Sequence, residues 1–70
     1  MIRYNVLKLD GSINEVLLLP IKNTNKYRFV NITKGHICTC EFDSIELAEQ
    51  DIEDRLTKGL LLSYIKTNQL

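Results

Sequence analysis

The first hairpin of the chain is encoded in residues 2–19, which read IRYNVLKL, DG and SINEVLLL in succession. Asp-Gly between two β-rich runs is one of the strongest signals for a two-residue turn, because both turn positions need positive φ. Such a turn at Asp10-Gly11 places Tyr4 opposite Leu17. This register predicts a core face made of Ile2, Tyr4, Val6, Ile13, Leu17 and Leu19. The reverse face then carries Leu7, Leu9, Val16 and Leu18.

A second hairpin is predicted around Lys34-Gly35, which follows the run from Tyr27 to Ile32. A two-residue loop places Tyr27 opposite Phe42 and Phe29 opposite Cys40, which makes an aromatic face. The other face then pairs Arg28 with Glu41, Val30 with Thr39, and Ile32 with Ile37. A three-residue loop with a bulge is the alternative, and it shifts the pairing by one residue and exchanges the faces.

A helix is predicted from about residue 44 to residue 57. Asp43 or Ser44 can cap it, and the apolar stripe consists of Ile45, Ala48, Ile52 and Leu56. Gly59 is expected to end the helix, and residues 60–66 then form a last strand or, alternatively, a helical turn. The predicted fold is α+β: two antiparallel β-hairpins, one α-helix packed on a sheet face and a short C-terminal strand, in the order ββββαβ.

The amino-acid composition limits the classes of protein to which the chain can belong. The chain has 70 residues, of which 44% are hydrophobic, and its 9 basic and 9 acidic residues give a net charge of zero. These numbers indicate a single small domain, residues 1–70, and exclude a two-domain enzyme. Residues 1–5 show no apolar signal segment, so we expect an untargeted cytoplasmic protein that does not enter a membrane. The Cys38-Thr39-Cys40 spacing favours reduced thiols.

Charge is strongly polarised along the chain. Residues 1–40 have a net charge of +4, whereas residues 41–57 have a net charge of −6. The acidic side chains of the predicted helix point away from its apolar stripe, and they are Glu46, Glu49, Asp51, Glu53 and Asp54. This acidic face could bind a basic partner or could simply be solvated, and a solvated face is the commoner condition of small helices.

The segment His36-Ile37-Cys38-Thr39-Cys40 is the clearest cluster of chemically reactive residues. Thiolate and imidazole ligands suit zinc, but the first and last of these positions lie ~13 Å apart along a strand, too far to share one metal. We therefore expect no metal and no cofactor. Cys38 with His36 is the sole candidate catalytic dyad, and without an orienting third group it does not predict an enzyme.

Residues 27–57 resemble the hairpin-plus-helix unit of integrase arm-binding DNA-binding domains, through the segment Phe42-Asp43-Ser44-Ile45-Glu46-Leu47-Ala48. The resemblance implies DNA contact through the sheet face opposite the helix. That face here offers Val30, Ile32, Ile37 and Thr39 beside only one cation, so nucleic acid is an unlikely partner. The alternative function is a nucleic-acid-binding module using the second hairpin, with contacts from Lys22, Lys26, Arg28 and Lys34.

The apolar residues on the predicted reverse faces need a cover. A single short helix covers one side of a sheet, which leaves a set large for a monomer to expose: Val16, Leu18, Val30, Ile32 and Ile37. A homodimer with Ile32 and Ile37 near its two-fold axis would bury this candidate interface. The sequence thus predicts a small non-enzymatic interaction or accessory protein that self-associates, with its acidic helix face available to a protein partner.

Overall fold

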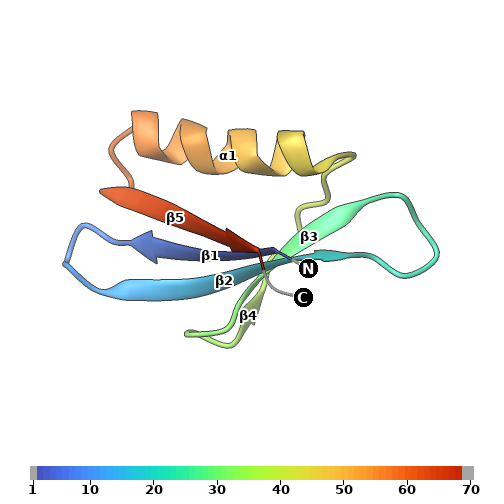
Figure 1. The fold of residues 1–70 in the computed structure, drawn as a ribbon, viewed down its shortest axis with the longest axis horizontal. Helices are drawn as coiled ribbons and strands as arrows, with labels where there is room; N and C mark the ends of the chain where they lie inside the picture. The colour runs from blue at the N-terminus through green and yellow to red at the C-terminus, as the bar shows by residue number, and fades with distance from the viewer. Residues whose placement is uncertain (1, 69–70) are drawn as a thin grey trace.

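A computed structural model of the chain describes residues 2–68. Within that range it contains one five-stranded antiparallel sheet and one helix (Figure 1). The elements are β1 (Ile2–Leu7), β2 (Ile13–Pro20), β3 (Tyr27–Asn31), β4 (His36–Ile37), α1 (Ile45–Thr57) and β5 (Ser63–Asn68). The sheet order is β4-β3-β2-β1-β5, so the C-terminal strand lies beside the first strand. The predicted α+β fold is confirmed, including the final strand.

The first hairpin has a different register from the predicted one. The Lys8 amide donates to the Ser12 carbonyl (2.8 Å) and the Gly11 amide donates to the Lys8 carbonyl (3.0 Å), which leaves a three-residue loop. Tyr4 therefore pairs with Val16 rather than Leu17. This turn needs positive φ at Gly11 alone (86°), and Asp10 does not adopt it. The Asp10 carboxylate instead accepts hydrogen bonds from the amide and the hydroxyl of Ser12.

This shift of one residue exchanges the two faces of β2. Leu18 is 2% exposed and belongs to the core, and Val16 packs against it. The prediction that Val16 and Leu18 form an exposed interface is therefore wrong. The prediction that Ile13, Leu17 and Leu19 lie on the core face is also wrong, because these residues lie on the side of the sheet away from α1.

The second hairpin keeps its predicted faces although its turn is longer. Tyr27 and Phe42 exchange two backbone hydrogen bonds (2.8 and 2.9 Å), as predicted. Nearer the turn, Val30 pairs with Ile37, so the register has moved by two residues from the predicted pairing. A shift of two preserves the side on which each residue lies. The predicted Phe29–Cys40 pair is wrong, because Phe29 accepts a backbone hydrogen bond from Cys38 instead.

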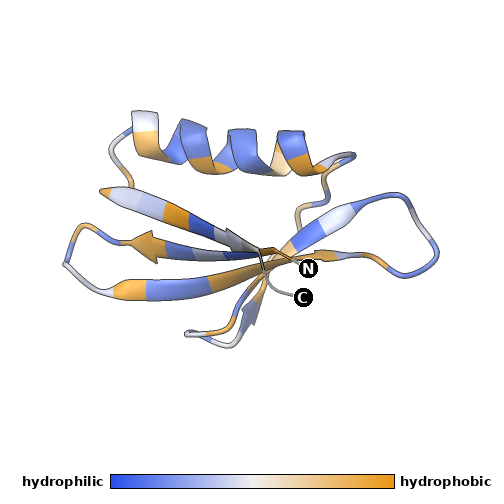
Figure 2. Cartoon of the chain, in the orientation of Figure 1, coloured by the Kyte–Doolittle hydropathy of each residue, from blue (hydrophilic) through white to orange (hydrophobic). Residues whose placement is uncertain are grey.

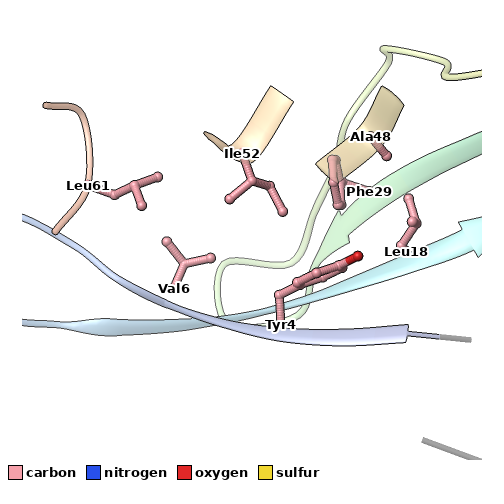
Figure 3. Close-up of a cluster of buried hydrophobic side chains, with 7 residues drawn as sticks. All are labelled: Tyr4, Val6, Leu18, Phe29, Ala48, Ile52 and Leu61. Carbon is pink, nitrogen blue, oxygen red and sulfur yellow. The ribbon is translucent and has the colours of Figure 1, made fainter. Parts of the chain in front are cut away.

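The core lies between α1 and the sheet. Its buried side chains come from three strands, the helix and the segment before β5 (Figure 3), namely Tyr4, Val6, Leu18, Phe29, Ala48, Ile52 and Leu61. The predicted stripe supplies Ala48 and Ile52 to this core, and the outer side of α1 is mainly hydrophilic (Figure 2). The Ser44 hydroxyl caps the helix by accepting from the Leu47 amide at 3.1 Å. After Lys58, Gly59 adopts a φ of 75°, as expected at the end of a helix.

Candidate functional site

The side of the sheet away from α1, here called the open face, carries four of the eight exposed large hydrophobic residues found among the described residues. Directly paired residues point to the same side of a sheet, and the pairs Leu7–Ile13, Leu17–Val30 and Val30–Ile37 fall on this one. The apolar residues of the open face are Leu7, Ile13, Leu17, Leu19, Val30, Ile32, Ile37 and Ile65. Of these, Ile13, Ile32, Ile37 and Ile65 are between 44% and 65% exposed. No described element covers them (Figure 1).

An ion pair sits within this apolar surface. Arg3 pairs with Leu17 across the β1–β2 ladder, and its Nε lies 2.7 Å from Glu15 Oε2. Arg3 Nε is buried, and its contact with Glu15 is an ion pair without the geometry of a hydrogen bond. On β3, Arg28 lies on the same face, and its Nε is also buried without a hydrogen bond. The Arg28 guanidinium lies 3.7 Å from the carboxylate of Glu41. The open face thus combines aliphatic side chains with two arginines that each lie near a glutamate.

Three of the five predicted interface residues lie on this face. Val30, Ile32 and Ile37 are where the sequence placed them, and Ile32 and Ile37 are exposed. The sequence analysis missed Ile13, Leu17 and Ile65, the first two because of the register error in β2. A three-residue turn at residues 9–11, had it been considered, would have placed Ile13 and Leu17 on the open face beside Val30.

The acidic side chains of α1 divide into two groups. Glu49 and Glu53 turn toward the sheet, where Glu49 accepts a hydrogen bond from the Tyr4 hydroxyl (2.7 Å) and Glu53 accepts one from the Tyr64 hydroxyl. Lys66 also lies 2.6 Å from Glu49, and this ammonium together with Tyr4 lowers the pKa of Glu49. The predicted acidic face is therefore not one outward surface, because two of its five carboxylates join the helix to the sheet.

The remaining acidic residues of the helix lie on its surface. Asp51 pairs with Arg55 (3.1 Å), and Asp54 accepts a hydrogen bond from Gln50 (3.0 Å). Glu46 is exposed in the first turn, where a carboxylate interacts favourably with the positive end of the helix dipole. Each of these groups thus has a local role within the helix.

The basic residues of the alternative nucleic-acid site do not cluster. Lys26 forms an ion pair with Asp43 (2.9 Å), which raises the pKa of Lys26, and Arg28 lies near Glu41. Lys22 precedes β3 and Lys34 follows it, so they lie at opposite ends of that strand. Phosphate binding requires several neighbouring cations without acidic partners.

The segment from His36 to Cys40 spans the short strand β4 and the loop after it. His36 and Cys38 line a small cavity beneath α1, whereas Cys40 is exposed. The Cys40 amide donates to Cys38 Sγ (3.4 Å), and the interaction with the Cys38 thiol raises the pKa of Cys40. Between residues 2 and 68 we find no disulfide at these cysteines, no hydrogen bond between His36 and Cys38, and no group of three or more ligands suited to a metal ion.

Comparisons with protein families, with curated proteins and with solved structures give no match to this chain. In the part of the chain that the structure describes, no helix combines the length and the apolar character needed to span a membrane.

Proposed function

We propose that this protein is a non-enzymatic interaction module whose open face binds a second copy of the same chain. The observation that carries the proposal is the row Leu17, Val30 and Ile37, which crosses β2, β3 and β4 on the side of the sheet opposite α1. Ile13, Ile37 and Ile65, from three different strands, are each more than half exposed. A monomer that leaves several large aliphatic side chains exposed on one face is unusual.

The size of the open face supports a weak dimer. Five strands about 4.8 Å apart and about six residues long give a face of roughly 24 by 20 Å, or about 500 Å². Stable interfaces bury about 800 Å² on each partner, and weak ones bury less. A reversible dimer with a dissociation constant of roughly tens of micromolar therefore suits this face.

The charges of the open face favour a second copy over an acidic or basic partner. Arg3 and Glu15 balance each other, and Arg28 is similarly balanced by Glu41. Around a two-fold axis, the Arg3 side chain of one copy can approach Glu15 of the other, because these side chains are 35% and 34% exposed. A surface whose positive and negative charges balance is complementary to itself.

The proposal assigns no reaction to the protein and places it in the cytoplasm. Both cysteines are thiols in the structure, and reduced thiols are typical of that compartment. The acidic residues that are exposed on α1 and make no contact with the sheet, Glu46 and Asp54, are available to a further protein partner.

Sedimentation equilibrium of the wild type, Ile37→Lys and Leu47→Lys tests this proposal. Leu47 is the matched control, because it is 52% exposed on α1 whereas Ile37 is 57% exposed on the open face. We expect the wild type and Leu47→Lys to dimerise alike and Ile37→Lys to remain a folded monomer with an unchanged circular dichroism spectrum. A wild type that stays monomeric up to about 500 µM, well above the expected dissociation constant, contradicts the proposal.

A further inference from the structure

A cavity of about 230 Å³ lies between α1 and the sheet, on the side opposite the open face. Its apolar lining comes from the core and its surroundings, and includes Val6, Val16, Phe29, Ile52 and Leu61. The C-terminal half of α1 contributes Asp51 and Arg55 to the rim, and β4 and the residue after it contribute His36 and Cys38. The cavity is therefore an apolar hollow with a polar rim, the usual composition of a small-molecule site.

Asn14 is the residue in this cavity that core packing does not explain. It lies on the same side of β2 as Val16 and Leu18, it is 4% exposed, and it lines the cavity. Asn14 forms no side-chain hydrogen bond to another residue between 2 and 68, and its amide atoms are not among the fully enclosed side-chain atoms that lack a partner, so they open into the cavity. A largely buried amide is stabilised by hydrogen bonds, so an amide that opens into an apolar cavity offers its donor and acceptor to a bound molecule.

The rim of the cavity carries an excess of positive charge. Asp51 is already paired with Arg55, through the Arg55 Nε at 3.1 Å, which leaves the terminal guanidinium nitrogens available. Lys8 also lines the cavity and forms no ion pair with any residue between 2 and 68. One acid and two bases at this rim favour a ligand with a single negative charge.

We propose that this cavity binds a small carboxylate with a single-ring apolar body. An apolar cavity of about 150 Å³ accepts benzene, so the larger cavity here has room for one ring and a carboxylate. The ring packs between Val16 and Phe29 of the sheet and Ile52 of α1. The Asn14 amide donates a hydrogen bond to the carboxylate, and Lys8 and Arg55 neutralise its charge.

This site is separate from the proposed dimer interface. Its residues lie on the α1 side of the sheet, whereas the interface lies on the open face, and Ile13 and Asn14 are adjacent residues that point to opposite sides. A variant that abolishes dimerisation should therefore still bind the small molecule.

Titration of ¹⁵N-labelled protein with benzoate, followed by NMR, tests the proposal. We expect a dissociation constant of about a millimolar or below, as is usual for so small a ligand, with the largest shifts at the Asn14 side-chain amide. Asn14→Leu should weaken binding about tenfold or more, because it removes a hydrogen bond to a charged group. The control Asn25→Leu lies in an exposed loop and should leave affinity unchanged.

The charge of the ligand is tested separately with benzamide, which has the same ring and a neutral head. Lys8→Gln should weaken benzoate about two- to fivefold and leave benzamide unaffected. Equal affinity of the wild type for both probes overturns the assignment of a carboxylate ligand. Benzoate shifts that are absent at Asn14, or that fall on residues outside the cavity, overturn the site itself, and this outcome needs only the wild-type protein.

Discussion

The Tyr4 hydroxyl donates a hydrogen bond of 2.7 Å to Glu49 Oε2 and so joins the buried centre of β1 to the middle of α1. Tyr4 is fully buried, and its ring contacts those of Phe29 and Tyr64 at centroid distances of 6.0 and 6.2 Å. Glu49 also holds Lys66 of β5, so one carboxylate connects the helix to two neighbouring strands. This arrangement makes Glu49 a structural residue rather than a surface charge.

Glu49→Ala should therefore lower the free energy of unfolding by about 1 to 3 kcal/mol, because it leaves the buried Tyr4 hydroxyl without its acceptor. Glu46→Ala is the control, since Glu46 is exposed and its loss should cost about 0.5 kcal/mol. Urea unfolding measures both variants. Equal midpoints would show that the Tyr4–Glu49 hydrogen bond adds no stability.

Tyr4 and Tyr64 donate hydrogen bonds to carboxylates of α1, so the protein should lose stability at high pH. The hydrogen bond to Glu53 raises the pKa of Tyr64 to about 12, and burial raises the pKa of Tyr4 as well. A raised pKa in the folded state means that the stabilisation is complete below the unfolded-state pKa of about 10 and is lost as the pH rises beyond it. Unfolding free energies should therefore fall between about pH 10 and 12. Tyr64→Phe should show a shallower decrease than the wild type, and an unchanged slope would contradict this explanation.

Asn14→Leu should raise the free energy of unfolding by about 1 kcal/mol in the absence of ligand, because it replaces an amide that makes no hydrogen bond to the protein with an apolar side chain of similar shape. Asn25→Leu, in the loop between β2 and β3, should change it by no more than about 0.5 kcal/mol. Thermal unfolding gives both values. A destabilised Asn14→Leu would mean that the amide is already satisfied in the folded protein.

Gly11→Ala tests the three-residue turn of the first hairpin. The φ of Gly11 is 86°, and no atom lies within 4 Å of the position a Cβ would take, so the substitution acts through backbone strain alone. The expected loss of stability is about 1 to 2 kcal/mol. A change below about 0.3 kcal/mol would argue that this turn does not need a residue with positive φ.

Local signals in the sequence predicted the helix well. Ser44 caps it, Ala48 and Ile52 are buried, and Gly59 ends it, because each of these features depends on residues within one or two turns of one another. The second hairpin kept its faces because its register moved by two residues rather than one.

The register of the first hairpin could not be read from the turn dipeptide alone. Asp10-Gly11 suits both a two-residue and a three-residue turn, and the second form is favoured by the hydrogen bonds from Ser12 to the Asp10 carboxylate. The error in the predicted register exchanged the faces of β2. It placed Leu17 in the core and Asn14 on the outside, so the sequence predicted neither the full open face nor the cavity beneath α1. The contacts of Glu49 could not be predicted either, because Tyr4 and Lys66 lie far from it in the sequence.

The most direct test of self-association through the open face is an NMR measurement on a mixed dimer of ¹³C-labelled and unlabelled protein, filtered for contacts between the two copies. The account predicts intermolecular contacts among the methyl groups of Leu17, Val30 and Ile37, and none from Leu47 on α1. Contacts that involve Leu47, or a dimer whose contacts lie along the outer edge of β5, would contradict the assignment of the open face as the interface.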